Sequence, residues 1–323
     1  MTYQVRGSTL RDMITEPTVL VLGAGASSPY GYPLGKDLYY EVVRGLHHYG
    51  SPIERFLSKI YREDPVRKFG AALRRSPSEA VDAFLEHNDQ FLDVGRSAIA
   101  CAIAQHEIED NVFPDSVTDT QGHWYRFLFD CLGPSFDRFG DNKLSLITFN
   151  YDRSIEHFMF TAMKNFYNRP EEECISQLTE LPIIHVHGSL VPLPWQSPDG
   201  VPFGKLGDGT HISESAAYIR IIHQVSAEDP QFGRARELLS KARHVYFMGF
   251  GYLPDNLRKL GLHGVPEGAQ LRGTAWGMSE SLKDRKRANI NGALGDQAAR
   301  VRVELHVCDC LNFLTNYRDV RLK

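Results

Sequence analysis

The sequence has no long hydrophobic run. No apolar stretch reaches the roughly 18 residues that a membrane-spanning helix needs. The N-terminus also lacks the basic segment and hydrophobic core of a secretion signal. We therefore expect a soluble, cytoplasmic protein that does not enter a membrane.

Excess charge is also missing. The 36 Lys and Arg residues nearly balance the 40 Asp and Glu residues, which gives a formal net charge of −4. This balance leaves no general electrostatic footprint for nucleic acid, so we expect no direct nucleic-acid binding. The one dense basic stretch, 283–287, is interpreted as the solvated face of a helix.

Closely paired cysteines are absent as well. None of the five cysteines forms a Cys-x-x-Cys pair, which argues against a disulfide framework and against a four-thiolate zinc site. We expect reduced thiols and no bound metal. Cys308 and Cys310 are interpreted as small, buried hydrophobic side chains.

Short apolar runs that end at glycine or at a polar residue are plentiful, and they are typical of buried strands. They lie at 18–25, 144–150, 181–188, 244–251, 271–277 and 301–307. Stretches of helical composition, such as 153–167, 213–226 and 281–295, separate most of them. This alternation predicts an α/β fold, a Rossmann-like doubly wound parallel sheet of about six strands.

The first two predicted strands are separated by far more chain than one crossover helix requires. We predict that residues 50–140 form an inserted module, while 1–49 and 141–323 form the Rossmann-like domain. Apolar residues spaced three and four apart predict that the insertion is helical. A stretch rich in Pro and Gly, 191–211, is predicted to be an irregular covering loop.

A glycine-containing turn follows the first predicted strand. Gly23, Gly25 and Ser27 precede a predicted helix, which is a suitable context for a phosphate group. Ser28 occupies the third glycine position of a dinucleotide fingerprint, so a simple tight turn remains an equal alternative.

Polar side chains follow the second predicted strand, where burial should end. Asn150 and Asp152 either cap the next helix or face a ligand, because ligands of open α/β sheets bind beyond the carboxyl ends of the strands. Tyr151, between them, is expected to point toward the packed interior. A cap role predicts lost stability on mutation, whereas a catalytic role predicts lost turnover.

These motifs, taken in order, resemble those of the sirtuin family. Five segments carry the resemblance: 23–33, 148–152, 187–188, 248–252 and 308–314. In that order, they are similar to the family's Gly-Ala-Gly-x-Ser plus Gly-x-Pro loop, its Thr-x-Asn-x-Asp and His-Gly motifs, its Gly-Thr-Ser loop and its terminal Asp-containing segment. Phe250 and Gly251 depart from the Gly-Thr-Ser pattern, and the last similarity is loose. Nothing in the insertion resembles the family.

The resemblance implies a role for each matched residue. Asp152 would hold the nicotinamide carboxamide, Asn150 would orient the ribose or a water, and His187 would accept a proton. His185 is expected on the same strand face as His187, as a hydrogen-bonded structural histidine. Contacts to the rest of NAD are implied for Gly23, Ala24, Gly25, Ser27, Pro33, Thr148, Gly249, Phe250, Gly251 and Asp309.

One departure narrows the implied function. Protein deacylase sirtuins commonly carry a four-cysteine zinc ribbon after the catalytic histidine, and no cysteine occurs between 175 and 307. The chain instead resembles the ribbon-less sirtuin-like NAD hydrolases of bacterial antiphage defence. This implies NAD as substrate, depletion of NAD in abortive infection, a homo-oligomer, and a partner such as a HerA-like ATPase or an Argonaute.

Two other classes of function stay open. An ADP-ribosyltransferase or deacylase of the sirtuin type would use an acceptor in place of water. A non-catalytic sensor would bind NAD or ADP-ribose without cleaving it. A pure sensor would have no need of a base beside the ribose.

Overall fold

Six short strands form one parallel sheet, as the apolar runs predict. The computed structural model describes residues 13–116, 122–133, 135–206, 209–221 and 229–316. The strands are β1 Thr18–Leu22, β2 Leu144–Thr148, β3 Ile183–His185, β4 His244–Met248, β5 Gln270–Thr274 and β6 Arg302–His306. Their order in the sheet is β3-β2-β1-β4-β5-β6, the order of a dinucleotide-binding Rossmann sheet.

Both faces of the sheet carry a buried apolar cluster, which explains why the central strands β1, β2 and β4 are mainly apolar. Side chains alternate along β1: Leu20 and Leu22 belong to one apolar cluster, whereas Val19 and Val21 belong to the other. The fold is therefore doubly wound, as predicted.

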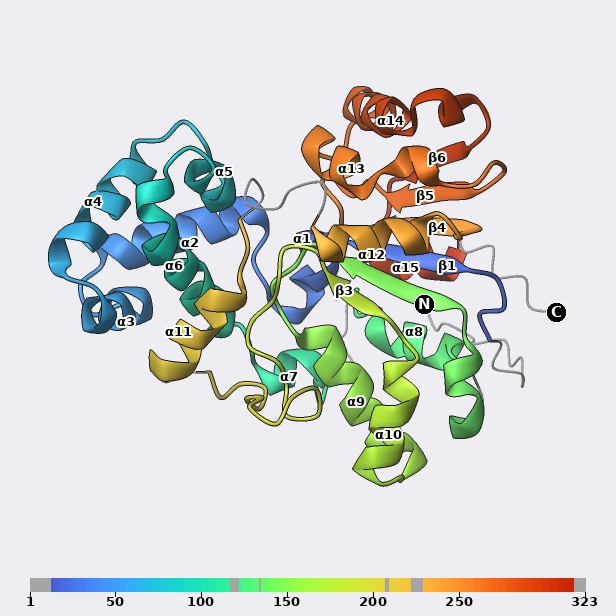
Figure 1. Cartoon of the computed structure of the whole chain (residues 1–323), viewed down its shortest axis with the longest axis horizontal. Helices are drawn as coiled ribbons and strands as arrows, with labels where there is room; N and C mark the ends of the chain where they lie inside the picture. The colour runs from blue at the N-terminus through green and yellow to red at the C-terminus, as the bar shows by residue number, and fades with distance from the viewer. Residues whose placement is uncertain (1–12, 117–121, 134, 207–208, 222–228, 317–323) are drawn as a thin grey trace.

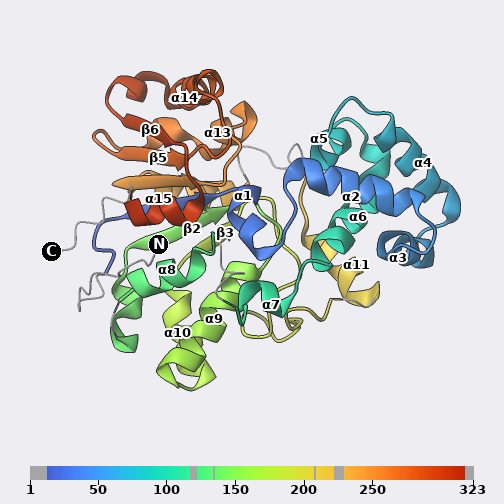
Figure 2. The same cartoon turned by 180° about the vertical axis from the view of Figure 1, so that it is seen from behind.

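The helices that cover the sheet divide between these two faces. Helices α12 (Pro230–Leu239), α13 (Pro254–Leu260) and α14 (Glu280–Leu294) supply the cluster that contains Val21. Helices α8 (Tyr125–Cys131), α9 (Ser154–Tyr167), α10 (Glu171–Thr179) and α15 (Cys310–Asn316) supply the cluster that contains Leu20. Figures 1 and 2 show α12 in front of the sheet and α15 behind it.

The remaining helices lie mostly between β1 and β2 in the chain. They are α1 Ala24–Ser27, α2 Gly35–His47, α3 Pro52–Ile60, α4 Glu63–Arg74, α5 Val81–Leu85, α6 Leu92–Ala104, α7 Glu109–Val112 and, after β3, α11 Gly209–Tyr218. The helix predicted over 213–226 corresponds to α11 in part, and 222–228 lie outside the described residues.

A helical module stands to one side of the sheet, beside α1 (Figures 1 and 2). It consists of α2 to α6 with α11, since α2 packs on α3, α4 and α6, and α11 packs on α6. The described part of 50–140 contains no strand. The boundaries at 50 and 140 stay a prediction, and two helices outside them, α2 and α11, pack on the module.

None of the helices in the described parts of the chain is long and apolar enough to cross a membrane. Because all six strands are parallel, the loops after β1, β2, β3 and β4 meet at one edge of the sheet. The chain reverses its direction across the sheet between β1 and β4, so this switch point is the expected ligand position.

Candidate functional site

The loops after β1 and β4 lie in direct backbone contact at the switch point. Gly23 N donates to Met248 O and Gly25 N donates to Gly249 O, each at 3.0 Å. A Cβ atom at Gly23 would lie 2.6 Å from Gly249 O, and one at Gly25 would lie 2.9 Å from Gly249 Cα. The close approach of two loops therefore accounts for these glycines by itself.

Asn150 ties the end of β2 to the β1 loop. Its Nδ2 donates to Gly23 O at 3.0 Å and to Ser27 Oγ at 2.8 Å, while its backbone N donates to Thr148 Oγ1 at 3.0 Å. Among the described residues nothing donates to its Oδ1. Asn150 is thus held by its amide nitrogen and keeps an acceptor free.

Asp152 is buried and caps the start of α9. Its Oδ1 accepts from Ser154 N at 3.1 Å and from the Ser154 hydroxyl. Burial raises the pKa of Asp152, against the lowering effect of hydroxyl donors from Ser154 and Ser27. Asp152 therefore meets one free backbone N–H at the start of α9, as the capping alternative required, although the N-cap residue itself is Arg153.

Tyr151 lies in the packed interior, as expected. Its hydroxyl donates to Asp82 Oδ1 at 2.8 Å, which links the β2 loop to α5 of the helical module. Burial raises the pKa of Asp82 to about 6, although the Tyr151 hydrogen bond opposes the shift.

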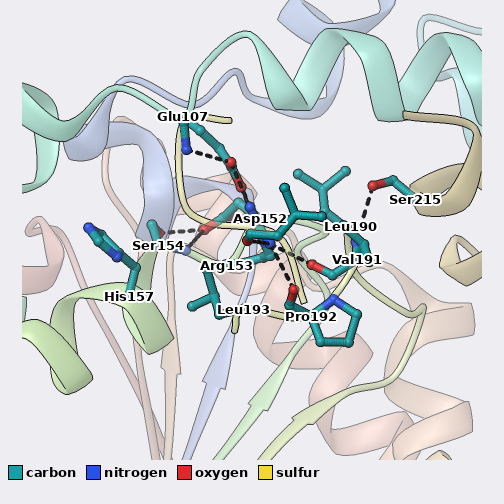
Figure 3. A network of polar contacts seen from close by, with 12 residues as sticks. Glu107, Asp152, Arg153, Ser154, His157, Leu190, Val191, Pro192, Leu193 and Ser215 are labelled. Atoms are coloured by element: carbon teal, nitrogen blue, oxygen red, sulfur yellow. Dashed lines mark hydrogen bonds and ion pairs between the residues drawn. The ribbon is translucent and has the colours of Figure 1, made fainter. Parts of the chain in front are cut away.

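Arg153, the next residue, holds the covering loop in place through a buried ion pair (Figure 3). Its Nε and Nη2 each lie 2.8 Å from a carboxylate oxygen of Glu107, which follows α6. Its Nη1 donates to Val191 O at 2.6 Å and to Val201 O at 2.8 Å. Gly204 N also donates to Glu107, at 3.0 Å. Loop 190–204 is therefore fastened to both β2 and the helical module.

Sequence reasoning missed this ion pair and the aromatic residues that support the β1 loop. Trp124 Nε1 donates to Ala26 O at 2.8 Å, and Tyr125 OH lies 2.7 Å from Ser154 Oγ. The rings of Tyr30 and Tyr125 stack with centroids 3.7 Å apart. Their run, 123–133, indicated only a helix, because spacing along a helix does not say which loop it touches.

His187 is buried without a hydrogen-bond partner. It is 3% exposed, and neither ring nitrogen is bonded to any described residue. Phe149 and Phe232 present edges to it, with ring centroids 5.2 and 5.7 Å away. Burial, with help from the charges of Lys259 and Arg220, lowers the pKa of His187 to about 3. The imidazole is neutral at physiological pH.

His185 has the opposite environment. Its Nδ1 lies 2.9 Å from Asn150 O, and its Nε2 lies 2.5 Å from Glu156 Oε1. Burial opposes the charge of His185, but the Glu156 carboxylate, its hydrogen bond and the Asn150 carbonyl raise the pKa overall. It is the hydrogen-bonded histidine of the pair, as expected.

The prediction that both histidines share one strand face is wrong. The strand ends at His185, and a turn closed by Gly188 N donating to His185 O at 3.2 Å follows. His185 therefore meets Glu156 of α9, whereas His187 packs on Phe232 of α12, across the sheet. The alternation of side chains does not continue into a turn.

The remaining predicted ligand contacts are placed as follows. Phe250 is buried against Phe149, with ring centroids 5.0 Å apart, and forms part of the wall beside His187. Asp309 accepts from Asn312 N and Nδ2, both at 2.7 Å, at the start of α15. Gly251 is exposed, and Ala24 and Pro33 are half-buried.

Tyr32, inside the Gly-x-Pro segment, is a further residue that sequence reasoning missed. Its side chain is 4% exposed and its hydroxyl has no partner among the described residues. Burial and the nearby carboxylates of Asp152 and Glu107 raise its pKa. The Tyr32 hydroxyl, the ring nitrogens of His187 and Asn150 Oδ1 therefore have no hydrogen-bond donor or acceptor among the described residues.

The cysteines are not placed for redox or metal chemistry among the described residues. All five cysteines are free and buried, and burial raises the pKa of Cys308 to about 11, so these thiols behave as apolar side chains. The parts of the chain that the structure describes contain no group of three or more His, Cys, Asp or Glu residues suited to a metal ion.

Comparison with known proteins adds no relative. No protein-family model matches the chain, and no curated protein matches it. The function must therefore be argued from the site.

Proposed function

We propose that the protein is an NAD glycohydrolase, which cleaves NAD and water to nicotinamide and ADP-ribose. The observation that carries this proposal is His187, a neutral, buried imidazole with both nitrogens unpartnered, at the ligand-binding edge of a Rossmann sheet. Buried polar groups are nearly always hydrogen-bonded, and exceptions call for an explanation such as a catalytic role. A substrate hydroxyl or water would satisfy the ring.

The residues fit the demands of the reaction. Departure of nicotinamide builds positive charge on the ribose, so the enzyme must hold the carboxamide, orient the ribose and place a water. The carboxylate of Asp152, which also accepts from Ser154 and Ser27, would hold the carboxamide, and Asn150 keeps Oδ1 for a ribose hydroxyl or water. His187 would accept hydrogen from a ribose hydroxyl or the water, because its lone pair is not protonated at neutral pH.

The glycines at 23 and 25 add less support than the sequence suggested. Their amides already bond the β4 loop, so they do not cradle a phosphate in this arrangement. The resemblance to antiphage NAD hydrolases extends the proposal to NAD depletion during infection. On the same resemblance, the proposal includes a homo-oligomer whose activity is triggered by a partner such as a HerA-like ATPase or an Argonaute.

The test measures nicotinamide release from NAD by the purified full chain, alone and with the proteins encoded beside it. We expect Asn150→Ala and His187→Ala to abolish release without loss of folding, checked by circular dichroism. His106→Ala is the matched control, because His106 is paired with Glu41 in the helical module and should leave turnover unchanged. Wild-type release by both site variants, or NAD binding without release under every condition, would refute the proposal.

A further inference from the structure

The two oxygen atoms that contact His185 favour its protonated form. A backbone carbonyl and a carboxylate only accept hydrogen, and they face Nδ1 and Nε2 of the same ring. When Glu156 is ionised, both nitrogens donate and the ring is an imidazolium. Glu156 is 3% exposed, so it supplies a buried counter-charge. The His185–Glu156 pair has no direct role in the proposed hydrolysis of NAD.

The pair lies at one end of a chain of contacts that crosses three strands. Glu156 of α9 holds His185 at the end of β3, and His185 holds the carbonyl of Asn150 beyond β2. The side chain of Asn150 then reaches Gly23 and Ser27 beyond β1. Both the backbone and the amide of Asn150 are thereby fixed, and His185 is the backbone anchor.

We propose that His185 is a positioning residue for Asn150, held as an imidazolium by Glu156 so that the free Oδ1 of Asn150 stays aimed at the ligand. This inference rests on the proposed function, and it adds a charge requirement to the site. His185 itself has no donor left for a substrate, so it acts through Asn150.

Other charged groups around His185 determine how pH acts on it. Glu156 and Asp152 favour the cation. Arg220 and Arg234 line the same cavity of about 360 Å³ as His185 and disfavour the cation, although Asp229 pairs with Arg220. The pKa of His185 is raised overall. Positioning is therefore complete below that pKa and is lost as pH rises through it.

The first test reads the protonation state directly, by nitrogen NMR of the histidine side chains in the full chain. We expect both nitrogens of His185 to carry protons at pH 7, while His187 shows the pattern of a neutral ring. A neutral His185 at pH 7 would overturn the proposal. This measurement does not depend on NAD turnover.

The second test separates charge from bulk. His185→Gln removes the charge and replaces one donor nitrogen with an acceptor oxygen, and we expect kcat to fall about 100-fold with KM little changed, as for a misplacement near 1 Å. His185→Lys keeps the charge, and the adjoining cavity has room for the longer chain, so kcat should stay within about threefold of wild type. Glu156→Gln should move the alkaline fall of kcat to lower pH.

The matched control is His244→Gln. His244 is also buried and paired with a glutamate, Glu16, but it starts β4 at the opposite edge of the sheet. We expect its kcat to equal that of wild type. Equal losses in His185→Gln and His185→Lys, or in His185→Gln and the control, would overturn a charge-dependent positioning role.

The two proposals fail in different ways. If the chain never releases nicotinamide, hydrolysis fails, and the side-chain amide signal of Asn150 still decides the positioning role. That signal should shift in His185→Gln and stay unchanged in His185→Lys. If nicotinamide is released and the wild type, His185→Gln and His185→Lys show the same Asn150 signal, the positioning proposal is refuted and the proposed hydrolysis is not.

Discussion

The loops after β2 and β3 differ from those after β5 and β6, although both pairs lie on the same edge of the sheet. Beyond β2 and β3, four polar side chains are almost completely buried: Asp152, Arg153, Glu156 and His187. Beyond β5 and β6, Trp276 is 71% exposed and Val307 is 53% exposed. One half of the edge is a buried polar interior, and the other is an open surface.

The candidate ligand-contacting residues of the two halves, His187 and Asp309, also differ in their hydrogen bonds. In the half beyond β2 and β3, the ring nitrogens of His187 and Oε2 of Glu156 have no hydrogen-bond partner among the described residues. In the second half, Asp309 is fully used as the cap of α15. Buried and unmet polar atoms cost stability, so a protein retains them where they serve a purpose. The difference favours the β2–β3 half as the reaction centre.

The largest effect is expected from Arg153→Met, which leaves Glu107 buried and unpaired. We expect the free energy of unfolding, measured in urea, to fall by about 3–5 kcal/mol. The matched control in the other half is Arg287→Met, because the Arg287–Asp284 pair on α14, which follows β5, lies at the surface and should be worth less than about 1 kcal/mol. Similar losses in the two variants would contradict the contrast between the halves.

A double variant shows whether the loss comes from the unpaired charge. Replacing Arg153 by Met and Glu107 by Leu together removes both buried charges. We expect this chain to be more stable than Arg153→Met alone, since paired removal of a buried ion pair is often nearly neutral. A double variant as unstable as the single one would assign the loss to the covering loop, whose carbonyls Arg153 also binds.

The next effect concerns His187→Phe, which should stabilise the chain while abolishing turnover. A phenyl ring suits the edges of Phe149 and Phe232 and brings no unmet polar atom, so unfolding should cost about 1–2 kcal/mol more. His123→Phe is the control, because His123 is buried but bonded to Pro29 O and should lose stability. If His187→Phe were less stable than the wild type, this would contradict our interpretation of His187 as a buried ring whose nitrogens have no hydrogen-bond partner.

The low pKa of His187 also predicts that the free energy of unfolding depends on pH. The pKa of His187 in the folded chain is about 3, below that of an unfolded histidine, so the unfolded chain binds the extra proton between these values. Stability is therefore lost as pH falls through this window. We expect the wild type to lose about 1.4 kcal/mol per pH unit relative to His187→Phe between pH 6 and 4, in urea titrations at each pH.

Sequence patterns predicted the sheet because its information is local. Strands β1, β2 and β4 are mainly apolar runs, and the helices between the strands have their own periodicity, so the alternation was visible without knowledge of contacts. The positions of Asn150 and Asp152 followed in the same way, because strand ends define the edge. The helical character of the insertion was predictable for the same local reason.

The rest of the site depends on contacts between distant segments. Arg153 and Glu107 are 46 positions apart, and no spacing rule pairs them. The separation of His185 from His187 depends on where β3 ends, and strand ends are the least certain part of a pattern. The Tyr32 hydroxyl is buried and has no hydrogen-bond partner among the described residues, which composition does not reveal.

The smallest effect is expected at Asp309, where the resemblance implies a contact with NAD and the structure shows a cap. Asp309→Ala should lower the free energy of unfolding by about 1 kcal/mol, whereas Asp309→Asn should lose less because its oxygen still accepts from Asn312 N. If Asp309 only caps, the KM for NAD stays the same in both variants. A tenfold rise of KM in a fully stable Asp309→Asn chain would instead place the carboxylate on the ligand, and the open half of the edge would then share in binding.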